Sequence, residues 1–239
     1  MKKIIFLLIL LSSCNNKDWA YNGKNNPANW GKIRDEYKFC QYGFNQSPID
    51  ISKDLASDFI DNPLKFNYSN SEVEKFPQKY NLQFNFYGKS YLEKNRKKYN
   101  LRFLTFRHPS EHLLESKNHS LEMQIYHKSE DEQWLVVSYF LEIADDLTKN
   151  NVKFDSLIDF IISKKNEDIF NLAEIIDPQG LVFFYDGSFT TPPCYEGVKW
   201  YVFQKPIIIS KEQMLTLIKK TIFVKSNVRQ VQKFNPEKF

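Results

Sequence analysis

The sequence contains little glycine, cysteine or histidine, and it has no large excess of charge of one sign. Only 7 glycines, 3 cysteines and 4 histidines occur in 239 residues, and the formal net charge at pH 7 is +4. This small charge provides no strongly basic surface, so we expect no nucleic-acid partner. Abundant Phe (21) and Tyr (13) together with scarce glycine favour a dense, strand-rich globular domain.

Long apolar runs are also absent, except for one at the N-terminus. Two lysines precede the apolar run 4–11, and residues 11–14, Leu-Ser-Ser-Cys, resemble the lipobox of bacterial lipoproteins. This order is typical of a secretory signal, and the run is too short to span a bilayer. We therefore predict a signal peptide over 1–13, a lipid on Cys14 and a tether over 14–18. An ordinary signal peptide with a chance cysteine is the alternative.

These features predict an exported protein that is lipid-anchored in the bacterial cell envelope. Asn15 does not match the aspartate that commonly retains lipoproteins in the inner membrane, so we expect the outer membrane, on either its periplasmic or its surface face. Export to an oxidising compartment would also let Cys40 and Cys194 form a disulfide. Two buried free thiols are the alternative.

Strand patterns dominate residues 19–239, which contain no repeat and no linker and therefore predict a single domain. Strand-like apolar patterns occur at residues 82–86, 101–107, 134–143, 181–185, 200–203 and 207–209. Apolar residues at helical spacing occur at 155–162, 166–176 and 211–219, and Ser210 is the expected N-cap of the last helix. The lysine-rich residues 89–98 predict a solvated hairpin or loop. The fold class is therefore α+β, mainly β, with a large sheet and peripheral helices.

Three separated stretches resemble the alpha-class carbonic anhydrases. The first stretch contains residues 19–21, 27–30, Cys40 and 46–51 (Gln-Ser-Pro-Ile-Asp-Ile). The second contains residues 109–112 (Pro-Ser-Glu-His) and 121–122 (Leu-Glu). The third contains residues 185–194, 196–198, Trp200, Pro206 and 212–214. The resemblance implies one domain around a twisted, mostly antiparallel sheet of about ten strands, with the active site at the foot of a cone. It also implies the Cys40–Cys194 disulfide and cis peptide bonds before Pro48 and Pro193.

The zinc-ligand positions of the family carry the wrong residues for zinc. Family chemistry requires three neutral imidazoles, which leave a fourth tetrahedral position for water. Aligned on 109–112 and 121–122, these positions hold Thr105, Arg107 and Gln124. Thr and Gln are weak neutral ligands, and Arg places a permanent positive charge where a dication should be. We therefore expect no metal, no cofactor and no catalytic residue here.

The existing histidines do not replace the missing ligands. Successive strand residues point to opposite faces, so His108 faces away from Arg107, and His127 faces away from Gln124. The resemblance implies that His112 is a buried structural histidine, and His119 lies in a predicted turn. We expect no site of three histidines.

Several residues that surround the zinc in the family are retained. The resemblance implies that Thr190 donates a hydrogen bond to Glu111, and that Glu122 holds the third ligand position. A satisfied buried polar network and a remnant of an active site both explain Glu111, His112, Glu122 and Thr190.

The substrate pocket is altered as well. Tyr126 stands where the family has a small aliphatic residue, whereas Val136, Val198 and Trp200 match its apolar wall. We expect a metal-free cavity lined by Arg107, Gln124, Tyr126, Val136, Phe189, Thr190, Thr191, Val198 and Trp200. Arg107 either forms a fixed ion pair with Glu111 and Glu122, or it binds a carboxylate, phosphate or bicarbonate together with Thr190 and Gln124.

These observations predict a catalytically inactive, carbonic-anhydrase-like envelope lipoprotein that acts as a binding or interaction module. Its partners would be the membrane lipid and a small anion or a protein. The alternative is a carbonic anhydrase that hydrates carbon dioxide to bicarbonate at an atypical zinc site. Different chemistry, such as ester hydrolysis, is less favoured because no Ser–His–Asp or Cys–His arrangement is evident.

Overall fold

The computed structural model describes residues 18–52, 55, 59–145 and 150–234. The predicted signal peptide, Cys14 and all but the last residue of the predicted tether lie outside this part of the chain. Within the described residues, no helix is long and apolar enough to cross a membrane.

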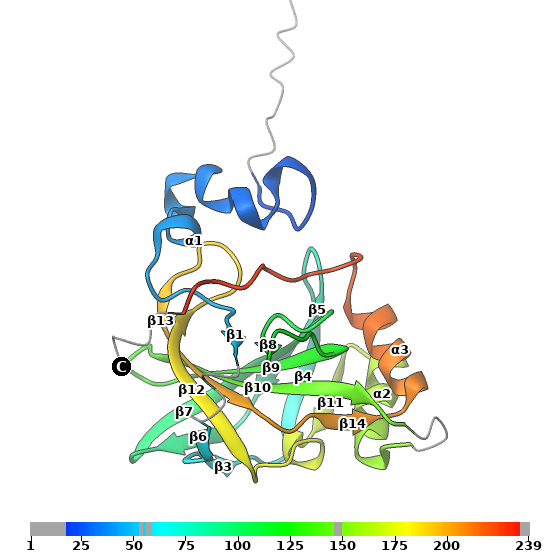
Figure 1. Cartoon of the computed structure of the whole chain (residues 1–239). Coiled ribbons are helices and arrows are strands. Elements are labelled where there is room, and N and C mark those ends of the chain that lie inside the picture. The colour runs from blue at the N-terminus through cyan, green and yellow to red at the C-terminus, as the bar shows by residue number, and fades with distance from the viewer. Residues whose placement is uncertain (1–17, 53–54, 56–58, 146–149, 235–239) are drawn as a thin grey trace, which may run out of the picture.

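One strongly curved sheet forms the body of the protein (Figure 1). Its main path is β11 (Glu167–Phe170), β4 (Ser71–Pro77), β5 (Leu82–Tyr87), β7 (Lys97–Arg107), β9 (Leu121–Lys128), β10 (Trp134–Ile143), β13 (Glu196–Phe203), β12 (Leu181–Ser188) and β2 (Ile60–Asp61). Outside this path, β14 (Ile207–Ile209) pairs with β10, and β6 (Tyr91–Lys94) joins β3 (Lys65–Asn67) to β7. Within the described residues the sheet has twelve strands, two more than the approximate number expected.

Most strand pairs are antiparallel, as predicted, but β10 pairs in parallel with both β13 and β14. A separate short parallel pair joins β1 (Asp50–Ile51) and β8 (Leu113–Leu114). All six strands predicted from the apolar pattern are present. Those at 134–143 and 207–209 have the predicted bounds, and the other four are longer than predicted by one to four residues.

The two faces of the central strands have different environments. On β9, Leu121, Met123 and Ile125 belong to the main hydrophobic core. Helices α2 (Asp155–Ile162) and α3 (Lys211–Thr221) contribute to this core, and the Ser210 side chain caps α3 as predicted. The alternate residues of β9 point to the opposite face, because side chains alternate along a strand. That opposite face carries the candidate site.

The structure overturns one secondary-structure prediction and decides between the two interpretations of another segment. The helix predicted over 166–176 is wrong, because Glu167–Phe170 forms the edge strand β11 and only Leu172–Glu174 makes a 3-10 turn, η6. Pairing of this segment with β4 prevails over its local helical spacing. The lysine-rich segment is a hairpin, as one of its two interpretations predicted, with β6 and β7 flanking Asn95 and Arg96.

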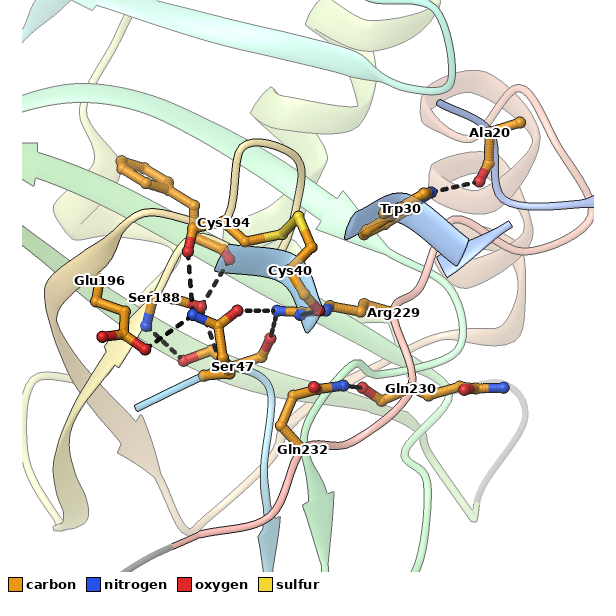
Figure 2. Close-up of a disulfide and its surroundings, with 12 residues drawn as sticks. Ala20, Trp30, Cys40, Ser47, Ser188, Cys194, Glu196, Arg229, Gln230 and Gln232 are labelled. Carbon is orange, nitrogen blue, oxygen red and sulfur yellow. Dashed lines mark hydrogen bonds between the residues drawn. A yellow bond between two sulfur atoms is a disulfide. The ribbon is translucent and has the colours of Figure 1, made fainter. Parts of the chain in front are cut away.

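An N-terminal cap of short helices lies at one end of the sheet (Figure 1). The cap comprises η1 (Gly23–Asn25), η2 (Pro27–Lys32), η3 (Asp35–Tyr37) and α1 (Phe39–Tyr42). Outside the cap, the 3-10 turn η5 (Val152–Phe154) precedes α2. The Cys40–Cys194 disulfide, with Cα atoms 5.0 Å apart, confirms the predicted pairing and fastens the cap to the loop after β12 (Figure 2). The buried Arg229 guanidinium reinforces this join by donating to the carbonyls of Cys40 and Ser47 at 2.7 Å. The peptide bonds before Pro48 and Pro193 are cis, as predicted, and so is the bond before Pro109.

Candidate functional site

Three rows of side chains cross the central strands on the face opposite the main core. A hydrophobic row joins Phe103 and Tyr126 to Val136 and Trp200. A polar row joins Gln83 and Thr105 to Gln124 and Ser138, and the next row begins with Arg107 beside Glu122. Thr105 and Gln124 are direct cross-strand partners, and Arg107 is two residues further along β7 on the same face. The register therefore brings Thr105, Arg107 and Gln124 together.

Arg107 forms the centre of a closed polar cluster. Its side chain is almost fully buried, and its Nε lies 3.2 Å from Glu111 Oε2 and donates to Gln124 Oε1 at 3.3 Å. Its Nη1 donates to the Tyr21 hydroxyl at 3.4 Å. Burial opposes the charge of Arg107, but the Tyr21 phenol and the Glu111 carboxylate hold its pKa above the ordinary value. Arg107 is therefore a permanent cation that is paired with a buried carboxylate.

The Gln124 amide is fully used by its neighbours. Its Nε2 donates to Glu111 Oε2 and to Glu122 Oε1, both at 3.0 Å. Its Oε1 accepts from Arg107 and from the Tyr126 hydroxyl, the latter at 2.9 Å. Two carboxylates on one side and two donors on the other fix the orientation of this amide.

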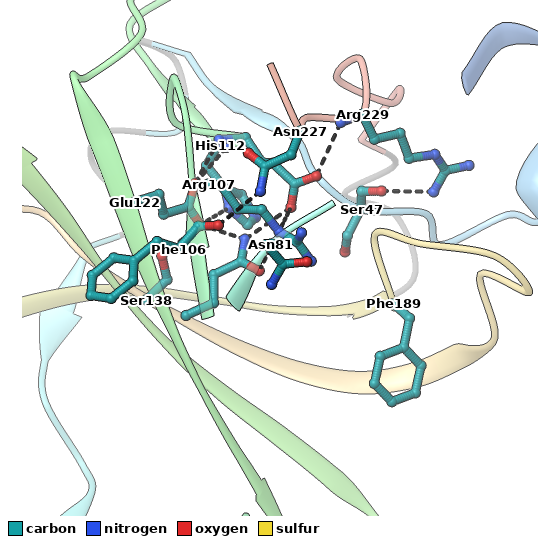
Figure 3. A network of polar contacts seen from close by, with 12 residues as sticks. Ser47, Asn81, Phe106, Arg107, His112, Glu122, Ser138, Phe189, Asn227 and Arg229 are labelled. Atoms are coloured by element: carbon teal, nitrogen blue, oxygen red, sulfur yellow. Dashed lines mark hydrogen bonds and ion pairs between the residues drawn. The ribbon is translucent and has the colours of Figure 1, made fainter. Parts of the chain in front are cut away.

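Glu122 and His112 form a second buried group behind Arg107 (Figure 3). Glu122 Oε2 accepts the backbone N–H groups of Glu111 and His112, and its Oε1 accepts from Ser138 Oγ at 2.7 Å. His112 Nδ1 lies 2.8 Å from Glu122 Oε1, and its Nε2 lies 2.6 Å from the Tyr185 hydroxyl. Burial would raise the pKa of Glu122, but His112 and these donors hold it at about 2. Glu122 is therefore ionised at neutral pH.

Two buried hydroxyls at the site have no hydrogen-bond partner among the described residues. Thr105 Oγ1 and Thr190 Oγ1 belong to side chains that are 3% and 1% exposed. The expected hydrogen bond from Thr190 to Glu111 is absent. Both oxygens of Glu111 are already occupied, one by Arg107 and Gln124 and the other by the Arg229 backbone N–H at 3.0 Å.

A cavity of about 170 Å³ opens above Arg107 and Tyr126. Aromatic residues from several elements contribute to its lining: Trp19, Tyr80, Phe103, Tyr126 and Phe189. Polar lining comes from side chains that include Asn81, Gln83 and Thr105. Burial raises the pKa of Tyr126 above its ordinary value, so this phenol is neutral at pH 7. None of the twelve lining residues is a histidine, a carboxylate or a cysteine.

The cavity differs in part from the one expected. Arg107, Tyr126, Phe189 and Thr191 line it, as predicted. The other predicted lining residues do not line it: Gln124, Val136, Thr190, Val198 and Trp200. Val136, Val198 and Trp200 are packed with Tyr126 in a hydrophobic cluster, because the tyrosine ring fills the space that a small residue would leave open.

The sequence of the whole domain matches one family. The family model described as eukaryotic-type carbonic anhydrase covers residues 25–238. The chain belongs to this alpha-class carbonic anhydrase family. A carbonic anhydrase of Nostoc sp. is 32% identical over 232 residues, which cover 91% of this chain and 83% of the relative.

Solved structures of carbonic anhydrases and of a related protein have the same fold. The alpha-carbonic anhydrase of Thermovibrio ammonificans, in complex with the inhibitor sulfanilamide, superposes with a TM-score of 0.80 at 26% identity, over 92% of this chain and 96% of that one. Dioscorin in complex with ascorbate gives a TM-score of 0.76 at 28% identity, over 90% of this chain and 94% of that one. The mainly β carbonic anhydrase fold is thus confirmed.

The residues at the three family ligand positions do not fit a zinc ion. Thr105 offers a neutral hydroxyl, Arg107 offers only donors, and the Gln124 oxygen already accepts two hydrogen bonds. Elsewhere in the described part of the chain, no group of three or more His, Cys, Asp or Glu side chains could hold a metal ion.

The four histidines of this carbonic anhydrase relative have other partners. His127 Nε2 lies 2.6 Å from the Tyr68 hydroxyl, and burial lowers the pKa of His127 to about 3. His108 Nδ1 lies 2.9 Å from the Ser120 carbonyl, and His119 Nδ1 lies 2.8 Å from Glu142. His112 contacts Glu122 and Tyr185, as described above. No imidazole lines the cavity.

Some residues that line the cavity are not among those predicted from the sequence. Phe103 could have been found from strand alternation, since it shares a face of β7 with Thr105 and Arg107. Gln78 and Lys79 lie in the turn between β4 and β5, and Trp19 lies before the N-terminal cap. No sequence pattern indicates that these three residues reach the same cavity.

Proposed function

We propose that this member of the carbonic anhydrase family does not hydrate carbon dioxide, and that its metal-free cavity binds a small molecule. The observation that carries the proposal is Arg107, whose buried guanidinium is paired with Glu111 at a position where the family requires a zinc ligand. A permanent cation at this place repels a dication, and its partners leave the Gln124 oxygen no free lone pair for a metal. A binding role is supported by the cavity above this cluster and by the dioscorin complex with ascorbate, which is a small organic molecule.

The Arg107 cluster also supports a structural explanation for the retained carboxylates. Glu111 and Glu122 are buried, and without a nearby cation their charges would be costly. Arg107 compensates Glu111 directly, and hydrogen bonds from His112, Ser138 and Gln124 satisfy Glu122. Their retention therefore does not require catalysis.

Stopped-flow measurement of carbon dioxide hydration tests the proposal. The purified protein, incubated with equimolar zinc, should give the buffer rate, and a sulfonamide should change nothing. Hydration that a sulfonamide inhibits would instead establish the alternative, a carbonic anhydrase with an atypical zinc site.

A matched variant shows whether the residues at these three positions alone prevent zinc binding. Thr105→His, Arg107→His and Gln124→His together would place three imidazoles on neighbouring positions of β7 and β9. We expect this triple variant to bind zinc more tightly than the wild-type protein, because three neutral nitrogen ligands are then available.

The proposed location is the bacterial cell envelope, with the protein anchored through a lipid on Cys14, in the outer membrane. The support is the lipobox-like sequence at residues 11–14. The binding module would then face an aqueous compartment outside the cytoplasm, where small extracellular or periplasmic molecules and other envelope proteins are available as partners.

A further inference from the structure

We propose that the cavity above Arg107 binds a neutral, hydroxylated ring of monosaccharide size. The inference rests on the proposed function, because it requires that no zinc occupies the floor of the cavity. Its support comes from the charges at the cavity, the aromatic wall, one unpaired hydroxyl and the cavity size.

The charges at the cavity disfavour an anion. Of the twelve lining residues, only Lys79 and Arg107 carry a charge. Arg107 is paired with Glu111 at 3.2 Å, and Lys79 is paired with Asp18 at 2.8 Å. Glu122, the cross-strand partner of Arg107, is held by His112, Ser138 and Gln124. An entering carboxylate or phosphate would find no uncompensated cation, so a neutral ligand fits better.

The wall of the cavity provides an apolar surface for a ring. Phe103 stacks on Tyr126 with ring centroids 4.4 Å apart, and Phe189 lies nearly parallel to Tyr126, with an angle of 5° between the planes. Trp19 and Tyr80 contribute the remaining aromatic lining and contact each other at 5.0 Å. Sugar rings present C–H groups on their faces, and these groups pack on the electron-rich faces of aromatic rings.

The polar groups of the cavity match a ligand that carries hydroxyls. Thr105 Oγ1 is buried and has no hydrogen-bond partner in the described part of the chain, and a ligand hydroxyl could both donate to it and accept from it. The side chain of Gln83, the direct cross-strand partner of Thr105, also lines the cavity. A cavity of about 170 Å³ takes one small ring, since pockets for drug-sized ligands begin at roughly 300 Å³.

Saturation-transfer NMR on the purified protein tests this inference. The ring probes are D-glucose, N-acetylglucosamine and myo-inositol at millimolar concentration, and the anion probes for titration calorimetry are acetate, phosphate and bicarbonate. We expect saturation transfer to at least one ring probe and no heat from the anions. The zinc content of the same sample is measured first. Zinc in the site would contradict the proposed function, and this measurement distinguishes that result from a failure of ring binding alone.

Two variants locate the binding. Thr105→Val keeps the side-chain shape and removes the hydroxyl, and it should weaken ring binding about tenfold. Phe189→Leu removes one aromatic face and should also weaken binding. Thr216→Val on α3, outside the cavity lining, is the matched control and should leave binding unchanged.

The inference is overturned if metal-free protein binds none of the ring probes, which would mean that the cavity holds water only. It is also overturned if the anions bind and the rings do not, or if ring binding survives both cavity variants unchanged. Ring binding that both variants weaken and the control does not would support it.

Discussion

At position 107, a guanidinium lies where the resemblance to the carbonic anhydrases implies a zinc-binding imidazole, and its neighbours satisfy it. Glu111 supplies the countercharge, Gln124 accepts one of its N–H groups, and Tyr21 from the N-terminal cap accepts another. Replacing a zinc ligand by arginine therefore involves more than the loss of a metal ligand, because it forms a new buried ion pair that the surrounding residues satisfy.

Removal of this guanidinium should strongly destabilise the fold. In Arg107→Ala, the buried Glu111 carboxylate loses its ion-pair partner, and breaking such a pair typically costs about 3–5 kcal/mol. Urea denaturation measures the change in the free energy of unfolding. Lys79→Met is the matched control, because it breaks the exposed Lys79–Asp18 pair and should cost less than about 1 kcal/mol. Equal, small decreases in the free energy of unfolding of both variants would contradict the stabilising role of the Arg107–Glu111 pair.

The low pKa of Glu122 predicts an acid-sensitive contribution to stability. A folded-state pKa of about 2, against 4.5 for the free side chain, corresponds to about 3 kcal/mol of stabilisation. This contribution is fully present above pH 4.5 or so, where the unfolded state is also ionised, and it is lost as the pH falls towards 2. Urea denaturation of wild type and Glu122→Gln should show a stability difference that shrinks across this range. A difference that is constant with pH would show that Glu122 is not ionised in the fold.

At the residue scale, the sequence predicted the cluster better than it predicted the bonds within it. Alignment on the retained motifs identified Thr105, Arg107 and Gln124, and the structure brings them together. It could not show that the Arg229 backbone, 118 residues from Glu111, would donate to that carboxylate. A local sequence pattern carries no information about such a distant contact.

At the scale of elements, the strands were predictable where alternation or continuous apolar runs are strong, and less so at the sheet edge. The segment 166–176 has helical spacing, yet residues Glu167–Phe170 pair with β4, and Asn171 caps a short turn after them. Pairing with a distant strand decided the structure there. The cavity is likewise a product of several elements, since its lining joins β5, β7 and β9 to the turn before β5, to Trp19 and to the loop after β12.

The disulfide should be a major source of stability for the N-terminal cap. Cys40 and Cys194 are 154 residues apart in sequence, and closing so long a loop is worth up to about 5 kcal/mol in the chain-entropy model. In Cys40→Ser/Cys194→Ser, we expect a lower free energy of unfolding and faster proteolysis of the cap, measured by urea denaturation and limited trypsin digestion. Unchanged stability and unchanged proteolysis would show that Arg229 and the aromatic contacts hold the cap without the disulfide.

At the scale of the whole molecule, the protein has the carbonic anhydrase fold, and the proposed function is that its cavity binds a small molecule without metal chemistry. The sheet, the disulfide and the polar rows remain as a rigid scaffold, and the ligand positions have become a closed ionic cluster. Residues 1–17 lie outside the described part, so the location of the protein stays a prediction from sequence.

That location is testable by fractionation. When the full chain is expressed in a Gram-negative bacterium, the wild-type protein should appear in the outer-membrane fraction, and Cys14→Ser should not, because it lacks the thiol that carries the lipid. Metabolic labelling with a fatty-acid analogue should mark only the wild type. Equal membrane association without labelling of either protein would favour an ordinary signal peptide and another means of attachment.

The most direct test of the central claim is the zinc content of the purified protein. Chains expressed with zinc in the medium are freed of loosely bound metal and analysed by elemental mass spectrometry against protein concentration, with the triple variant Thr105→His/Arg107→His/Gln124→His as control. The account predicts far less than one zinc per wild-type chain. One tightly bound zinc per wild-type chain would contradict it, because the Arg107–Glu111–Gln124 cluster could not then have the arrangement described.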